Sequence, residues 1–108
     1  MTSKKEMPFG ISDEVFSEII QIFKEHEHIE KAILFGSRAK GTYKPGSDID
    51  IALNGQELNL KDVLSMQNRL DDLDQPYFFD LVILNSITED GLKQHIERVG
   101  VEIYSKAK

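Results

Sequence analysis

The sequence of 108 residues contains no cysteine and no tryptophan, and it has only three prolines. Without cysteine the chain has neither a disulfide framework nor a thiolate zinc site, which agrees with a reducing compartment. It also lacks an apolar run long enough to cross a bilayer, and its N-terminal residues lack the hydrophobic segment of a secretion signal. These absences predict a cytoplasmic protein that does not interact with membranes.

Basic residues are the minority among the charged ones. The 13 Lys and Arg residues against 19 Asp and Glu residues give a formal net charge of −6. Proteins that bind duplex DNA neutralise phosphates with a basic face, so this balance argues against duplex DNA as a partner. A local basic patch can still bind one nucleotide. The length and the ordinary composition predict a flexible N-terminus over residues 1–11 and a single domain over residues 12–108.

The hydrophobic pattern predicts alternating helices and strands. Helical spacing predicts a helix over residues 13–24 capped by Ser12, and another that begins after Asn59 and ends before Pro76. We expect the apolar face of this second helix to consist of Leu60, Val63, Leu64, Leu70 and Leu73. Apolar runs predict strands over residues 31–35, 48–53, 77–84 and 101–104. Ser86 and Glu89 form a capping-box pattern for a last helix.

The order of these elements predicts the topology of a sheet. A helix between the second and third strands implies a right-handed crossover and parallel pairing, whereas the first two strands can pair antiparallel. We therefore predict an α/β (α+β) fold with a small mixed sheet of three to four strands flanked by helices.

The stretch ILFGSRAKGTYKPGSDIDIA, residues 33–52, is the most informative part of the chain. An apolar strand stops at a Gly-Ser pair, a basic loop follows, and the chain re-enters an apolar run through Asp48 and Asp50. Alternate side chains of a strand share a face, so both aspartates point to one face while the isoleucines between and after them point to the core. Two such carboxylates repel each other unless a cation lies between them.

A third carboxylate, Asp80, interrupts the apolar run YFFDLVIL. An unpaired charge in a buried strand is costly. If the second and third strands are neighbours, Asp80 can converge with Asp48 and Asp50. Oxygen ligands without histidine or cysteine favour Mg²⁺ or Mn²⁺, and such acids bridge the ions in two-metal phosphoryl-transfer sites.

The Gly-Ser turn and its basic neighbours could bind phosphates. Gly36 allows close approach of the backbone, and the amides of the turn that starts at Ser37 can donate to phosphate oxygens. Arg38 and Lys40 could neutralise further charge, with Arg38 the better bidentate donor. Lys44 is interpreted as an ordinary loop charge. Together with the three acids, this pattern predicts nucleotidyl transfer.

Three histidines lie outside this pattern. The sequence Glu-His-Glu-His at residues 25–28 has the look of a metal cluster. It lies at a helix end without a further ligand nearby, so we interpret it as a solvated helix terminus. We expect His95 on the surface of the last helix.

The segments GSRAKG and PGSDIDIAL, with the third acid in FFDLVIL, resemble the GS-x(10)-DxD-type signature of the DNA polymerase β-like nucleotidyltransferase superfamily. The short length is most similar to the minimal nucleotidyltransferases of that superfamily. The resemblance implies that Gly36 and Ser37 bind the nucleotide phosphates. It also implies that Asp48 and Asp50 hold the metal ions, and that Asp80 ligates one ion and assists deprotonation of the acceptor hydroxyl.

The resemblance further implies ATP as the substrate and Mg²⁺ or Mn²⁺ as the cofactor. One position departs from the pattern, because many relatives carry arginine where this chain has Lys40. Lysine keeps the positive charge and loses the planar fork. The resemblance therefore implies that Lys40 lies beside the phosphates as a positive charge, without the bidentate hydrogen bonds of arginine.

The resemblance also bears on the acceptor. Antibiotic nucleotidyltransferases resemble this core but append a helical region that completes the acceptor pocket, and this chain ends a few residues after Tyr104. Minimal nucleotidyltransferases are commonly paired with a small helical HEPN protein, so the leading interpretation is an antitoxin that transfers AMP from ATP to that partner. A homo- or hetero-oligomer is compatible with it. A non-catalytic nucleotide-binding subunit and an antibiotic nucleotidyltransferase are the alternatives.

Overall fold

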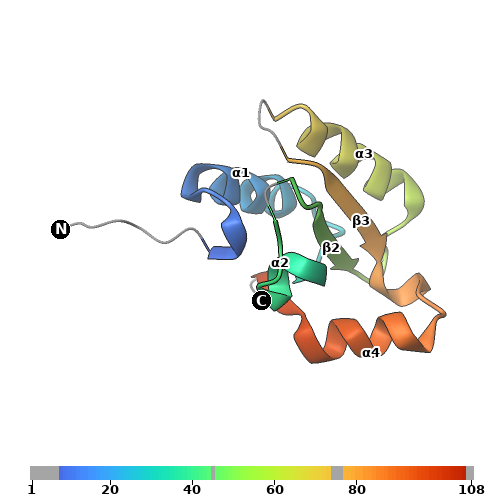
Figure 1. Ribbon diagram of the computed structural model, residues 1–108. Coiled ribbons are helices and arrows are strands. Elements are labelled where there is room, and N and C mark those ends of the chain that lie inside the picture. Colours follow the sequence, from blue (N-terminus) through green and yellow to red (C-terminus); the bar gives the residue numbers. More distant parts are fainter. Residues whose placement is uncertain (1–7, 45, 74–76, 107–108) are drawn as a thin grey trace.

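The computed structural model describes residues 8–44, 46–73 and 77–106 (Figure 1). Four α-helices and two 3₁₀ turns alternate with four strands. The helical elements are η1 (Pro8–Gly10), α1 (Asp13–Lys24), α2 (Gly36–Lys40), α3 (Leu60–Asp71), η2 (Leu84–Ser86) and α4 (Asp90–Val99). The strands are β1 (Lys31–Phe35), β2 (Ile49–Asn54), β3 (Phe79–Ile83) and β4 (Val101–Ser105). None of the helices in these ranges is long and apolar enough to cross a membrane.

The four strands form one mixed sheet in the order β3-β2-β1-β4. β2 pairs antiparallel with β1 and parallel with β3, which confirms the topology predicted from the connections. α3 supplies the crossover that a parallel pair needs. β4 returns antiparallel along the other side of β1. The predicted α/β fold with a small mixed sheet is therefore confirmed, and the sheet has four strands.

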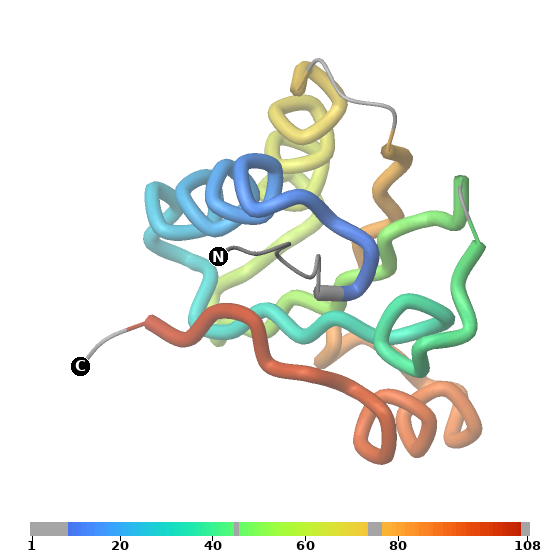
Figure 2. Tube along the Cα trace, turned by 60° about the vertical axis from the view of Figure 1, so that its left-hand side comes forward, coloured from blue at the N-terminus to red at the C-terminus, as the bar shows by residue number. Residues whose placement is uncertain are grey.

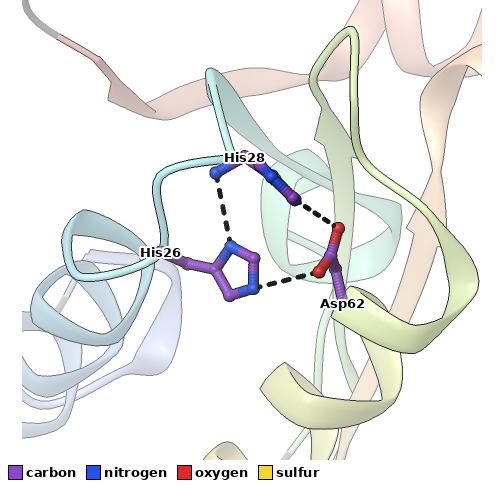
Figure 3. A group of neighbouring side chains, drawn as sticks. All are labelled: His26, His28 and Asp62. Atoms are coloured by element: carbon purple, nitrogen blue, oxygen red, sulfur yellow. Dashed lines mark hydrogen bonds and ion pairs between the residues drawn. The ribbon is translucent and has the colours of Figure 1, made fainter.

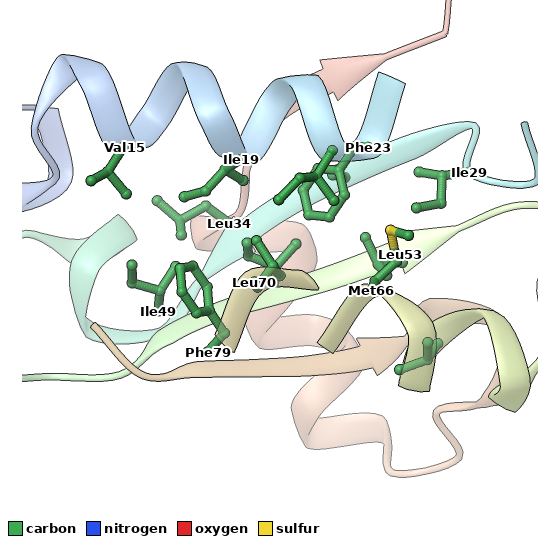
Figure 4. Packing of buried hydrophobic residues seen from close by; sticks show 14 of the residues in the cluster. Val15, Ile19, Phe23, Ile29, Leu34, Ile49, Leu53, Met66, Leu70 and Phe79 are labelled. Carbon is green, nitrogen blue, oxygen red and sulfur yellow. The ribbon is translucent and has the colours of Figure 1, made fainter. Parts of the chain in front are cut away.

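The helices lie on both faces of the sheet, with α1 and α3 on one face and α4 on the other (Figures 1 and 2). The larger hydrophobic core lies under α1 and α3, as Figure 4 shows. β2 contributes Ile49, Ile51 and Leu53 to this core. Because side chains alternate along a strand, Asp50 lies on the opposite face, toward α4.

Local signals explain where α1 and α3 begin. The Ser12 hydroxyl accepts a hydrogen bond from the Val15 amide at 3.3 Å, and α1 has the predicted bounds. Asn59 and Asp62 form a reciprocal capping box at the start of α3. The predicted apolar face of α3 is partly wrong, because Leu60 and Leu64 are exposed. The residues that this helix buries are Val63, Met66 and Leu70.

Three other expectations differ from the structure. β3 is an edge strand and shorter than predicted, and Phe78 before it is 70% exposed. The capping box at the last helix is wrong, because Ser86 belongs to η2 and the Glu89 side chain makes no capping hydrogen bond. The expected flexible segment 1–11 lies outside the described residues up to residue 7, while Ile11 is buried in the core.

Candidate active site

The end of β1 and the start of β2 meet at Gly36. In the antiparallel pair Phe35 lies opposite Asp50, and Gly36 follows directly. The backbone of Gly36 has φ of 77°, a conformation that L-residues with a Cβ rarely adopt. A Cβ at this position would also overlap the Oδ2 atom of Asp50. Only glycine therefore lets the carboxylate of β2 lie directly against the backbone that leads into α2.

Asp80 on β3 lies beside Asp50 on β2. The parallel register of β2 and β3 aligns Asp50 with Asp80, so both side chains project from the same face of the sheet. Asp48 lies just before β2, since that strand begins at Ile49. Asp80 is exposed because β3 is an edge strand. The expectation of a buried charge at Asp80 is therefore wrong, although its neighbour across the ladder is the predicted one.

The three acids interact electrostatically. The pKa of Asp50 is raised from 3.8 to about 6, mainly by burial and further by the negative charges of Asp80 and Asp48. The positive charge of Arg38 acts in the opposite direction on the pKa of Asp50. A divalent cation beside Asp50 would favour its ionised form in the same way, with a larger charge.

The donor set fits a hard cation. All three side chains offer carboxylate oxygens, which are the ligands that Mg²⁺ and Mn²⁺ prefer. The Asp50 carboxylate lies against the Gly36 backbone. The candidate metal ligand on β2 is therefore adjacent to the turn α2, which is predicted to bind phosphate. In the described part of the chain, one group of three His, Cys, Asp or Glu residues has its ligand atoms within 4.8 Å of one another, and it does not contain these aspartates. The three aspartates therefore do not converge that closely.

The predicted helical turn after Gly36 is α2, which Gly41 ends in the left-handed conformation with φ of 84°. The Ser37 carbonyl accepts hydrogen bonds from the amides of Gly41 and Thr42 at 2.9 and 3.0 Å. Ser37 is half-buried and Lys40 is exposed. The first-turn amides of a helix have no intrahelical acceptor, so this turn presents donors next to Asp50.

Arg38 has partners that the sequence did not reveal. It is 3% exposed and is the one buried charged side chain of the described residues. Its guanidinium stands over the rings of Tyr43 and Tyr77, at 5.2 and 5.4 Å from their centroids. Its nitrogens donate to the carbonyl oxygens of Ser47 at 2.8 Å, Phe9 at 2.8 Å and Gly10 at 3.3 Å. These contacts indicate that Arg38 holds the loop in place, and they argue against a direct contact between Arg38 and phosphate.

His95 also lies at this site. Its Nε2 atom accepts a hydrogen bond from the Gly36 amide at 3.3 Å, and its ring packs edge-on against Phe35. The imidazole therefore carries its proton on Nδ1 when it is neutral. The prediction of a helix-surface residue missed this contact, which connects residues 59 positions apart in the sequence. No local pattern could have predicted it.

A second polar cluster lies at the opposite end of the β1/β2 pair, where residues 25–28 approach α3 (Figure 3). His26 Nε2 lies 3.3 Å from Asp62 Oδ1, and His28 Nδ1 lies 2.8 Å from Asp62 Oδ2. The interpretation of residues 25–28 as a solvated terminus without a partner is therefore wrong. The missing partner is 34 residues away from His28 and is brought there by the capping box of α3.

The charges of this second cluster compensate each other. The hydrogen bond to Asp62 raises the pKa of His28, against the effect of desolvation. Burial acts to raise the pKa of Asp62, but hydrogen bonds from His28 and from the Asn59 backbone outweigh it and lower that pKa. Both shifts stabilise the ionised pair.

Comparison with known proteins agrees with the fold. Residues 17–108 match the model of the family described as polymerase beta, nucleotidyltransferase. The match spans most of the chain, and the protein therefore belongs to the polymerase β nucleotidyltransferase family. No curated protein matches the sequence significantly.

Solved structures narrow this assignment. A structure described as a toxin-antitoxin with AMP-PNP is 28% identical, with a TM-score of 0.69, and the alignment covers 84% of this chain and 73% of that chain. A Shewanella oneidensis complex, described as a tri-AMPylated HEPN toxin with MNT antitoxin, is 24% identical with a TM-score of 0.63 over 85% and 71% of the chains. A MntA-HepT toxin-antitoxin is 23% identical with a TM-score of 0.64 over 88% and 74%. The last two show the shared fold. Within its family the protein is a minimal nucleotidyltransferase.

Proposed function

We propose that the protein transfers AMP from ATP to a hydroxyl group of a partner protein, with divalent ions held by Asp48, Asp50 and Asp80. The observation that carries this proposal is the contact between the Asp50 carboxylate and the Gly36 backbone. It brings a candidate metal ligand and the donors of a phosphate-binding turn to the same point. The register of Asp80 with Asp50 adds a second carboxylate there.

In the proposed reaction the acceptor oxygen forms a bond to the α-phosphorus of ATP, and the bond to the β-phosphate oxygen breaks and releases pyrophosphate. Mg²⁺ or Mn²⁺, when bound, would supply the charge that stabilises the phosphates in the transition state. Asp80 accepts the proton of the hydroxyl, since it is the exposed carboxylate at the sheet edge, where an acceptor can approach.

The phosphate side of the proposal rests on α2. The Ser37 amide and hydroxyl donate to the phosphates beside Gly36, whose own amide donates to His95. The exposed Lys40 adds charge without a bidentate fork. Arg38 is a positioning residue in this scheme. Its hydrogen bonds to backbone carbonyls hold the loop that leads from α2 to Asp48.

A HEPN-type toxin is the proposed partner. The support comes from the 28%-identical structure, which is described as a toxin-antitoxin containing AMP-PNP. In the Shewanella oneidensis complex the HEPN toxin is described as tri-AMPylated. We propose the same relation here, with this chain as the antitoxin and a hydroxyl of the helical partner as the acceptor.

The test is a transfer assay with the helical protein encoded beside this chain. Incubation with Mg²⁺ and ATP labelled on the α-phosphate should label the partner, whereas ATP labelled on the γ-phosphate should not. Intact mass should rise by whole AMP units. The Asp50→Asn variant should lose the transfer, while Asp72→Asn, the same chemical change at an exposed site, should keep it.

Two outcomes would replace the proposal. Binding of ATP by wild type and by Asp50→Asn without label on any partner would indicate a non-catalytic nucleotide-binding subunit. Label on an aminoglycoside or another small hydroxyl compound in the absence of the partner would indicate a small-molecule nucleotidyltransferase.

A further inference from the structure

We propose that His26, His28 and Asp62 form a binding site for Zn²⁺ that is separate from the site of nucleotidyl transfer. These three side chains are the one group within the described part of the chain whose metal-ligating atoms all lie within 4.8 Å of one another. They lie at the end of the β1/β2 pair that is opposite to Gly36 and Asp50. Their donor set is also different, because imidazole suits Zn²⁺ and carboxylates alone suit Mg²⁺.

The distances suit a tetrahedral ion. Zinc bonds to nitrogen and oxygen are about 2.0 to 2.1 Å long, so neighbouring ligands in a tetrahedron lie roughly 3.4 Å apart. His26 Nε2 and Asp62 Oδ1 are 3.3 Å apart, which meets this requirement without movement. His28 Nδ1 lies 2.8 Å from the other carboxylate oxygen, Oδ2, so side-chain rotation has to bring one Asp62 oxygen to ligand distance from both nitrogens.

Of the two imidazole nitrogens that face away from the ion, that of His28 has a carboxylate partner. His28 Nε2 lies 3.8 Å from Glu57 Oε1, and a carboxylate on the remote nitrogen of a metal-bound histidine raises its basicity and fixes its orientation. His26 Nδ1 accepts from the His28 amide at 3.4 Å. When His26 binds an ion through Nε2, its proton moves to Nδ1 and this long hydrogen bond is lost. That loss is small compared with a metal–imidazole bond.

The two chain segments that carry the ligands are held together by other contacts. Asp62 is oriented by the Asn59 amide, which donates to its Oδ2 atom at 3.1 Å. A Cβ at Gly55 would overlap the His28 carbonyl, so the start of the β2–α3 connection lies directly on the histidine segment. The Glu30 amide donates to the Asn54 carbonyl at 2.8 Å. A metal ion therefore meets ligands that the fold has already brought together, which reduces the entropic cost of binding.

The site is accessible from solvent. The His26, His28 and Asp62 side chains are 20%, 34% and 13% exposed. A surface pocket opens beside His28, and its lining residues are Glu27, His28, Glu30, Gln56, Glu57 and Lys106. Three protein ligands leave one position of a tetrahedral ion for water. We therefore infer an exchangeable ion that joins the end of α1 to the start of α3.

Zinc titration of the tag-free full-length protein tests this inference. The background is the Asp48→Asn/Asp50→Asn variant, in which the acids of the transfer site do not compete for the ion. Isothermal titration calorimetry with Zn²⁺ should give one site. His28→Ala and His26→Ala should each weaken it at least tenfold, and so should Asp62→Asn, which keeps an oxygen for the α3 cap. Co²⁺ in place of Zn²⁺ should give the intense visible absorption of a tetrahedral ion.

His95→Gln is the matched control, because it removes the third imidazole of the chain and should leave the zinc affinity unchanged. Circular dichroism identifies variants that do not fold, and Asp62→Asn serves as the readout if a histidine variant is lost. The same affinity in Asp62→Asn and in its background would overturn the proposal. Zinc binding that disappears in His95→Gln would overturn it as well.

Discussion

The two ends of the β1/β2 ladder carry polar groups of opposite character. At the end with Gly36, the carboxylates of Asp50 and Asp80 lie side by side, and burial together with the negative charge of Asp80 raises the pKa of Asp50. At the other end, Asp62 faces two histidines, and the pKa shifts of Asp62 and His28 stabilise their ionised forms. Binding of a cation or a proton stabilises the first end, because it reduces the repulsion between the carboxylates. At the second end, the histidines already neutralise the charge of Asp62. Nucleotidyl transfer is therefore expected to be sensitive to changes at the first end and insensitive to changes at the second.

The largest expected effect concerns transfer at the first end. Asp50→Asn should lower the rate of AMP transfer by at least about 100-fold, because a carboxylate that holds positive charge against the phosphates is lost. The rate of label transfer from α-labelled ATP to the partner measures this loss. Asn59→Ala, which alters only the opposite end, should transfer at the wild-type rate once corrected for the folded fraction. Equal losses in both variants would remove the functional distinction between the ends.

Gly36→Ala should destabilise the protein by about 3 kcal/mol, since it combines a left-handed backbone with overlap of Asp50. Gly41→Ala is the matched control. Its φ is 84°, but a Cβ there meets nothing within 4 Å, so only the backbone cost of about 1 to 2 kcal/mol applies. Urea unfolding gives both free energies. If the two variants lose the same stability, the close contact of Asp50 with the Gly36 backbone is incorrect.

Asn59→Ala should lower the free energy of unfolding by about 1 kcal/mol, because it removes the side-chain acceptor for the Asp62 amide. Asn59→Ser keeps an acceptor at the same position and should recover most of that stability. Thermal unfolding of the two variants provides the comparison. A loss that serine does not recover would assign the effect to something other than the cap.

The smallest expected effect is a pH dependence in the presence of EDTA. The pKa of Asp50 is raised from 3.8 to about 6, so the folded protein binds a proton more tightly than the unfolded chain does. As the pH rises from about 4 to about 7, the wild type should therefore lose stability relative to Asp50→Asn. Partial exposure limits the difference to about 1 kcal/mol above that range.

Urea unfolding at several pH values measures this difference, with Asp72→Asn, the same chemical change at an exposed site, as the control. Saturating Mg²⁺ should reduce it, since the ion stabilises the ionised form of Asp50 in the wild type. A wild type that gains stability over Asp50→Asn as the pH rises would contradict the sign of the pKa shift.

Elements that depend on local sequence were predicted well. α1 begins after the Ser12 cap as predicted, and β1 ends where the apolar run meets Gly36. The short α2 ends at Gly41, because glycine takes the left-handed conformation that ends a helix. The parallel pairing of β2 with β3 followed from the helix between them. Alternation along β2 then placed Asp50 on the face away from the core.

Features that depend on long-range contacts were not predictable. An apolar run such as YFFDLVIL has the same pattern in a central and an edge strand, so the exposure of Asp80 depends on the order of the sheet. Arg38 was predicted as a bidentate phosphate donor, because its carbonyl partners at residues 9 and 10 carry no side-chain signal. The partner of His28 lies 34 residues away, and no spacing rule connects them.

The hydrogen bonds of Arg38 have a practical consequence for anyone who shortens this chain. Two of the carbonyls that receive its guanidinium belong to Phe9 and Gly10, which a sequence-based trimming at residue 12 would discard as an unstructured leader. Such a deletion would leave a buried cation without two of its three carbonyl acceptors, next to the loop that leads to Asp48. A shortened protein that still folds but binds ATP poorly should therefore not be taken as an inactive enzyme.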